Sequence, residues 1–102
     1  MGASYKVATV QDIKPGDTKR VEAGEETIAL YNCDGEFYAT DDLCSHAEAS
    51  LSDGWLEDHE ITCPLHGSAF DVTTGRPLCL PATKPVRTYP VRLEGDDIYI
   101  EV

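Results

Sequence analysis

The 102-residue sequence lacks any run of apolar residues long enough to cross a membrane. Its first six residues, MGASYK, also lack the apolar stretch of a signal peptide. There is no dinucleotide-binding GxGxxG fingerprint in a βαβ context, and no segment has the length and periodicity of a helix. These absences favour a cytoplasmic, all-β protein that works without a membrane and binds neither nicotinamide nor flavin.

Basic residues are missing from the middle of the chain. All eight Lys and Arg fall within residues 6–20 and 76–92, whereas residues 21–75 hold thirteen acidic side chains and no basic one. The net charge of -11 disfavours nucleic acid and anionic membrane surfaces as partners. We expect the acidic middle to dock on basic patches of protein partners, an attraction that salt would weaken. Solubility alone is the other explanation of this charge.

Residues with strand propensity alternate with short turn signals along the chain, which indicates one antiparallel β domain over residues 1–102. Asp34-Gly35 predicts a two-residue hairpin turn. Pro90 predicts an edge or a bulge within the strand that contains it. The expected strands cover residues 4–10, 18–23, 27–33, 36–40, 86–93 and 98–102.

Two short motifs carry the chemistry, Cys44-Ser45-His46 and Cys63-Pro64-Leu65-His66, with sixteen residues between His46 and Cys63. Two thiolates and two imidazoles suit either zinc or an iron–sulfur cluster. Zinc modules usually pair like ligands, whereas each pair here is mixed, and a binuclear cluster can use that mixing. One Cys from each motif would bind the first iron, and one His from each would bind the second. A zinc site stays open as the alternative.

The other two cysteines, Cys33 and Cys79, belong to no motif, and we interpret them as small, partly buried residues. His59 lies between two acidic residues and is interpreted as a solvated surface residue. Trp55 and Leu56 are expected to pack beneath the motif-bearing loops.

The motif pair, followed by Gly67-Ser68 and Phe70-Asp71, resembles the cluster-binding motif of Rieske proteins. The segments FYAT, LSDG, TG and TYPV, at residues 37–40, 51–54, 74–75 and 88–91, resemble the small Rieske ferredoxins of bacterial ring-hydroxylating dioxygenase systems. The resemblance implies one [2Fe-2S] cluster, and its ligands would be Cys44, His46, Cys63 and His66.

The same resemblance implies a Rieske fold. In that fold, an antiparallel β-sandwich base made from both chain ends carries an inserted cluster-binding subdomain, here at about residues 43–81. Gly67 and Ser68 are expected beside the cluster sulfur, and Pro81 in the loop that covers the cluster.

Three positions distinguish the chain from the Rieske proteins of respiratory and photosynthetic complexes. Those proteins have a disulfide joining the positions of Ala49 and Leu65, and a tyrosine hydroxyl where this chain has Phe70. Hydrogen bonds to sulfur stabilise the reduced cluster, so their loss lowers the reduction potential. We expect a potential at the low end of the Rieske range.

The implied role is that of a one-electron carrier. A flavin-dependent NAD(P)H reductase would reduce the cluster, and a terminal ring-hydroxylating oxygenase would take up the electron. The chain would act as a monomer and would not itself be an enzyme, because it has no spare mononuclear iron site such as a two-His, one-carboxylate set. Two alternatives stay open: a Rieske subunit of another redox enzyme, of the nitrite-reductase small-subunit type, and a zinc-stabilised interaction module.

Overall fold

The structure is a computed structural model that describes residues 3–44, 48–65, 67–79 and 84–102. Within these ranges the chain forms eleven strands and two short 3-10 helices, which confirms the all-β class. The strands are β1 (Ser4–Thr9), β2 (Thr18–Ala23), β3 (Glu26–Cys33), β4 (Glu36–Asp41), β5 (Trp55–Glu57), β6 (Glu60–Thr62), β7 (Ala69–Asp71), β8 (Pro77–Cys79), β9 (Thr88–Tyr89), β10 (Val91–Glu94) and β11 (Asp97–Glu101). The 3-10 helices are η1 (Val10–Asp12) and η2 (Leu51–Asp53).

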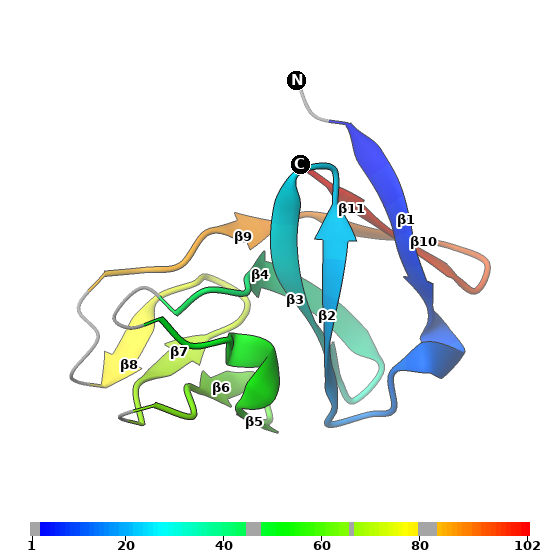
Figure 1. The fold of residues 1–102 in the computed structure, drawn as a ribbon. Helices are drawn as coiled ribbons and strands as arrows, with labels where there is room; N and C mark the ends of the chain where they lie inside the picture. Colours follow the sequence, from blue (N-terminus) through cyan, green and yellow to red (C-terminus); the bar gives the residue numbers. More distant parts are fainter. Residues whose placement is uncertain (1–2, 45–47, 66, 80–83) are drawn as a thin grey trace.

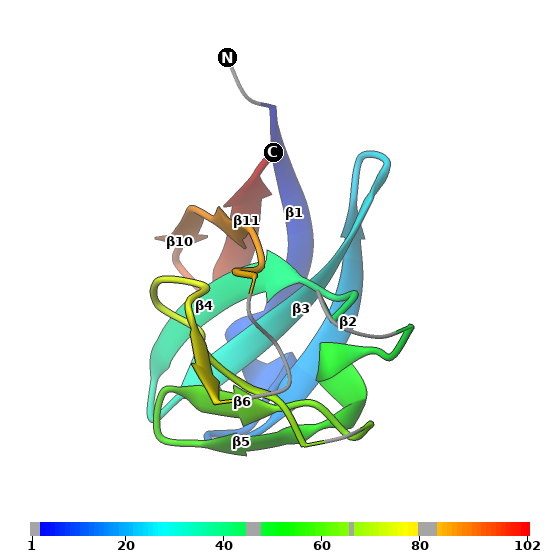
Figure 2. The same cartoon turned by 90° about the vertical axis from the view of Figure 1, so that its left-hand side faces the viewer.

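The strands form three antiparallel sheets (Figures 1 and 2). The first has the order β1-β11-β10, the second β2-β3-β4-β9, and the third β5-β6-β7-β8. The first sheet joins the two ends of the chain, since Tyr5 of β1 pairs with Ile100 of β11. Val21, Leu30 and Ile98 belong to one core between the first two sheets. These two sheets form the antiparallel base that the Rieske fold predicts.

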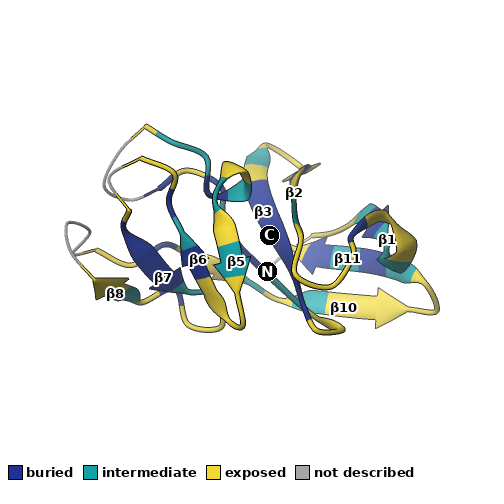
Figure 3. Ribbon diagram, turned by 90° about the horizontal axis from the view of Figure 1, so that it is seen from below, coloured by how far each residue is buried: buried dark blue, intermediate teal, exposed yellow. Residues whose placement is uncertain are grey.

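Strand β3 contributes to two cores, because successive side chains of a strand point to opposite faces. Ile28 and Leu30 pack into the core of the base. Tyr31 points the other way and packs in a second core with Phe70 of the third sheet. Residues 28–33 are all buried, as the dark blue ribbon of β3 shows in Figure 3. A strand covered on both faces has a run of apolar residues in place of alternation, and within residues 28–33 only Asn32 is polar.

The third sheet is built from residues that lie between β4 and β9 in the sequence. β4 and β9 pair with each other, with Ala39 opposite Tyr89. The chain therefore leaves the base after β4, forms the third sheet beside it, and returns at β9 (Figure 1). The assignment of residues 43–81 as a cluster-binding subdomain stays a prediction.

Pro90 separates two strands that the sequence predicts as one. β9 pairs with β4 in the second sheet, whereas β10 pairs with β11 in the first, so the chain changes sheets at the proline. Proline has no N–H to donate to a ladder. Its carbonyl accepts a hydrogen bond from the N–H of Glu101 at 3.1 Å. The expected strand over residues 86–93 is therefore interrupted in the way that a proline imposes.

Trp55 does not pack beneath the loops, so that expectation is wrong. It lies on β5 with 63% of its surface exposed, while its neighbour Leu56 turns inward against the second core. The alternation of a strand explains the difference, because only one of two successive residues can face the core. No helix in the described residues is long and apolar enough to span a membrane.

Candidate metal centre

The first motif-bearing loop follows β4 and is closed by backbone pairing. The N–H of Cys44 donates to the carbonyl of Ala49 at 2.9 Å. Leu43 and Ser50 form an isolated antiparallel bridge one step further out. Cys44 therefore occupies a fixed place at the start of this loop.

Asp42 connects this loop to η2. Its carbonyl accepts a hydrogen bond from the N–H of Leu51 at 2.7 Å, and its side-chain Oδ1 accepts one from the N–H of Ser52 at 3.0 Å. Asp42 is only 4% exposed, so this hydrogen-bonded side chain is buried between the loop and η2. Ser50 and not Asp42 stands at the N-cap position of η2, and Asp42 lies ten residues before Ser52, so no local capping signal in the sequence marks it for this role.

The second motif-bearing loop joins β6 to β7. The N–H of Cys63 donates to the carbonyl of Ser68 at 2.6 Å, and Thr62 pairs with Ala69 immediately outside the loop. Gly67 has a φ of 72°, a left-handed conformation that favours glycine in so tight a turn. Ser68 is fully buried.

The two loops bring Cys44 and Cys63 together. The two residues are 3% and 0% exposed, and both belong to the second core. Burial raises the pKa of the Cys63 thiol, and the nearby Cys44 raises it further, whereas a hydrogen bond from the backbone N–H of Leu65 lowers it. Two adjacent sulfur atoms shielded from water, one accepting a backbone N–H, fit the thiolate end of an iron–sulfur cluster.

Three of the expected site residues, His46, His66 and Pro81, lie outside the described residues. Among the residues that the structure describes, no group of three or more His, Cys, Asp or Glu side chains could hold a metal ion. The structure thus brings together the two predicted sulfur ligands, and the complete four-ligand set stays a prediction.

The remaining cysteines differ from each other. Cys33 is buried in the second core, and this burial raises its pKa to about 11. Cys79 is exposed, which corrects the expectation that it is partly buried, and its Sγ lies 3.6 Å from the carbonyl oxygen of Gly67. All four cysteines are free thiols.

Exposed leucines flank the paired cysteines. Leu43, next to Cys44, is 62% exposed, and Leu65, two residues after Cys63, is 44% exposed. Phe70 is fully buried in the second core and has no hydroxyl to offer the site. The sequence analysis did not assign either leucine to a surface, because nothing local separates an exposed leucine from a core one.

Asp71, at the end of β7, shows how this part of the fold should respond to acid. Its Oδ1 accepts hydrogen bonds from the hydroxyl of Thr73 at 2.6 Å and from the N–H of Thr73 at 2.8 Å. These bonds favour the charged carboxylate, and they lower the pKa of Asp71 below its usual value. A carboxyl with a depressed folded pKa stabilises the fold above its unfolded pKa, and this stabilisation is lost as the pH falls through the folded value.

We therefore expect Asp71→Asn to lower the free energy of unfolding by about 0.5–1 kcal/mol near neutral pH, since bonds to a charged acceptor are the stronger ones. The difference from the unaltered chain should narrow as the pH falls below about 4, and it should close only below the depressed folded pKa of Asp71, where both side chains are neutral. Urea unfolding over a pH series measures it. Thr73→Val, which removes the hydroxyl donor, should reproduce part of the pH-dependent difference. An Asp71→Asn effect that is constant with pH would contradict a depressed pKa of Asp71.

Known proteins resemble the chain over most of its length. The family model described as Rieske [2Fe-2S] domain matches residues 3–90. The ferredoxin component of the naphthalene 1,2-dioxygenase/salicylate 5-hydroxylase systems of Ralstonia sp. is 48% identical over 95 residues, 93% of this chain and 91% of that protein. The 3-phenylpropionate/cinnamic acid dioxygenase ferredoxin subunit of Escherichia coli K12 is 50% identical over 94 residues, 91% of this chain and 88% of that protein.

A solved structure extends the likeness to three dimensions. A chain in the complex of reduced oxygenase and oxidized ferredoxin in carbazole 1,9a-dioxygenase matches with a TM-score of 0.90 and 40% identity, over 95% of this chain and 91% of that chain. Because the family model spans most of the sequence and the relatives share about half of their residues with it, the chain belongs to the Rieske [2Fe-2S] family, among the ferredoxin components of aromatic dioxygenase systems.

Proposed function

We propose that the chain carries single electrons from a flavin-dependent NAD(P)H reductase to the terminal oxygenase of an aromatic ring-hydroxylating dioxygenase system. The pairing of two buried thiols, Cys44 and Cys63, from two separate loops is the observation that carries this proposal. His46 and His66 complete the proposed ligand set. The bound [2Fe-2S] cluster supplies a reversible one-electron centre.

The described residues around the cysteines bind and shield this centre. The buried sulfurs of Cys44 and Cys63 exclude water from the thiolate end. The N–H of Leu65 holds one sulfur by a hydrogen bond. Gly67 allows the tight turn of the second loop. Ser68 is fully buried, and its carbonyl accepts a hydrogen bond from the N–H of Cys63. Both residues are therefore proposed to tune the reduction potential of the centre. Pro81 is proposed for the covering loop.

Phe70 supports a low reduction potential. The side chain is fully buried in the core beneath the loops and carries no hydroxyl. A hydrogen bond to sulfur would stabilise the electron-rich reduced form, so its absence at this position favours a centre that gives its electron away readily.

The docking surface combines apolar and acidic residues. Exposed Leu43 and Leu65 flank the cysteines and offer an apolar contact. Residues 21–75 add thirteen acidic side chains and no basic one, which complements a basic patch on a partner. A carrier that alternates between two partners works most simply as a monomer, and four cysteines without a disulfide among them suit the reducing cytoplasm.

The proposed function is tested with the reductase and terminal oxygenase of the Ralstonia naphthalene 1,2-dioxygenase system as probes. The purified chain should contain two irons and two acid-labile sulfides, and NADH with the reductase should give the reduced Rieske EPR signal. Adding the oxygenase should then reoxidise it. A colourless zinc protein without sulfide would support the interaction-module alternative, and an intact cluster that neither probe reduces nor oxidises would rule out the carrier role.

The charge distribution predicts that the rate of reduction by the reductase falls severalfold as salt rises from about 0.01 M to about 0.5 M, because salt screens attraction between exposed charges. Stopped-flow absorbance measures this rate. Reduction by dithionite, a small anion that needs no docking, serves as the control and should lack that fall. Reductase rates that stay flat across the salt series would remove the electrostatic part of the docking argument.

A further inference from the structure

The chain crosses between the base and the third sheet through two connecting segments, residues 41–44 on the way out, beginning with the last residue of β4, and residues 85–88 on the way back, ending with the first residue of β9. The segments lie side by side where they leave the base. Ala39 and Thr40 of β4 pair with Tyr89 and Thr88 of β9. Immediately beyond this pairing, Asp41 and Arg87 come together.

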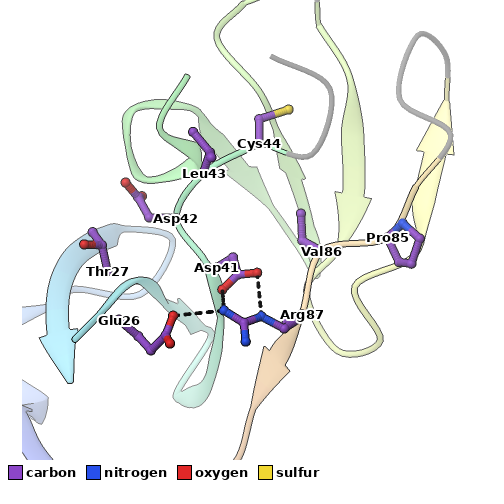
Figure 4. Close-up of a pocket in the computed structure, with 9 residues that line it drawn as sticks. All are labelled: Glu26, Thr27, Asp41, Asp42, Leu43, Cys44, Pro85, Val86 and Arg87. Carbon is purple, nitrogen blue, oxygen red and sulfur yellow. Dashed lines mark hydrogen bonds and ion pairs between the residues drawn. The ribbon is translucent and has the colours of Figure 1, made fainter. Parts of the chain in front are cut away.

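The side chain of Arg87 joins three elements (Figure 4). Its Nε and Nη2 donate to the two carboxylate oxygens of Asp41 at 3.1 and 3.2 Å, and Nη2 also donates to Oε1 of Glu26 at 2.9 Å. The hydroxyl of Tyr89 donates to Oδ1 of Asp41 at 2.5 Å, and the guanidinium carbon lies 5.5 Å from the Tyr89 ring centroid. The backbones are joined as well, since the N–H of Asp41 donates to the Arg87 carbonyl at 2.9 Å. We call these four residues the Arg87 fork.

A cavity of about 610 Å³ lies next to the fork, between the two connecting segments and the start of β3 (Figure 4). Leu43 and Cys44 form part of its wall, together with Val86. The side chains of the described residues leave this flank of the first connecting segment open, and Leu43 is largely exposed. Asp42 and Cys44 are buried, and the backbone of the segment is held by pairing, since Asp41 lies opposite Ile28 and the N–H of Asp42 donates to the Thr27 carbonyl at 3.2 Å. The Arg87 fork adds side-chain bonds to this pairing at the open flank.

The fork is linked to the first loop through one residue. Asp42 follows Asp41 directly and closes the loop through its bonds to the N–H groups of Leu51 and Ser52. Any rotation of the backbone at Asp41 moves Asp42, and with it the position of Cys44 against Cys63. The fork holds both oxygens of the Asp41 carboxylate and so restricts that rotation.

We propose that the Arg87 fork positions the first cluster loop, so that the thiol of Cys44 is held against Cys63 before and after cluster binding. Arg87 is a positioning residue, because it touches neither cysteine and acts through Asp41. The inference rests on the proposed function only in taking Cys44 and Cys63 as cluster ligands.

The chain offers a matched control. Arg92 of β10 also pairs with a carboxylate, with Nη2 at 3.2 Å from Oε2 of Glu94, and lies 4.9 Å over the ring of Tyr99. The side chains of Arg92 and Arg87 are similarly exposed, at 52% and 64%. Arg92 belongs to the base and is remote in sequence from both loops. Arg92→Ala thus removes the same kind of contacts without touching a connecting segment.

The first readout is amide hydrogen exchange of the protein as purified, followed by mass spectrometry on a peptide covering residues 42–54. Arg87→Ala should speed exchange in this peptide by about tenfold, and Arg92→Ala should leave it unchanged. Arg87→Lys should fall between the two, because an ammonium group cannot bind both carboxylate oxygens as a planar fork does. Asp41→Asn combined with Arg87→Ala should add little to Arg87→Ala, since both changes break one unit.

The second readout is the cluster. Arg87→Ala should release iron to a chelator about tenfold faster than the unaltered protein and broaden the EPR lines of the reduced state, because the ligand loop then samples several positions. Exchange and iron release in Arg87→Ala within about twofold of Arg92→Ala would overturn the inference. An unaltered protein that binds no cluster would instead contradict the proposed function, and the exchange measurement would still decide the role of the fork.

Discussion

Cys63→Ala is expected to give a protein without iron, acid-labile sulfide or colour, whereas Cys33→Ala keeps all three. Cys63 is fully buried against the thiol of Cys44, so the side chain is part of the paired sulfur site. Its removal would leave the iron that Cys44 and Cys63 bind with one protein ligand in place of two, and no other cysteine can take its place. Cys33 lies elsewhere in the second core, and Cys79 is exposed on β8. The expected effect of Cys63→Ala is therefore complete loss of the cluster.

The two buried cysteines are well matched for this comparison. Cys33 is 5% exposed, so Cys33→Ala removes as much buried sulfur as Cys63→Ala and costs a similar amount of packing. Iron and sulfide analysis with EPR of the dithionite-reduced samples separates loss of a ligand from loss of stability. Two irons per chain in Cys63→Ala would show that the sulfur pair is not the cluster site. A cluster lost equally from both variants would assign the loss to packing and not to a missing ligand.

Much of the fold could be predicted from the sequence because its signals are local. Asp34-Gly35 predicts a tight hairpin turn, and both residues have positive φ values, 55° and 98°. The expected strand over residues 18–23 matches β2. Pro90 separates β9 from β10 because its missing N–H acts at its own position.

The site was predictable only in part. Cys44 and Cys63 could be paired because their chemistry and spacing form a motif, and the structure brings their thiols together. The Arg87 fork joins Asp41 to Arg87, 46 positions away in the sequence, and no local sequence pattern predicts such a contact. The outward position of Trp55 depends on which face of β5 meets the core, which is fixed by the pairing of the whole third sheet.

Gly75, in the turn before β8, holds the return segment in place. It has a φ of 79°, its N–H donates to the Asp71 carbonyl at 2.7 Å, and its own carbonyl accepts from the N–H of Val86 at 2.9 Å. A Cβ added at this position would lie 2.1 Å from the carbonyl oxygen of Val86 and 3.2 Å from Cγ2 of Thr88. The backbone oxygen cannot move aside without breaking the segment that leads to Arg87.

Gly75→Ala should consequently lower the free energy of unfolding by about 4 kcal/mol or more, because a steric clash with backbone adds to the strain of a left-handed alanine. Gly16 provides the matched control, since its φ is 89° and an added Cβ would meet nothing within 4 Å. Gly16→Ala carries the strain alone and should cost about 1–2 kcal/mol. Urea unfolding of both variants gives the comparison, and failure of Gly75→Ala alone to fold would agree with it. Equal losses of unfolding free energy in the two variants would mean that the backbone at Val86 moves aside at little cost. Such a mobile backbone could not hold Arg87 in a fixed position against the first cluster loop.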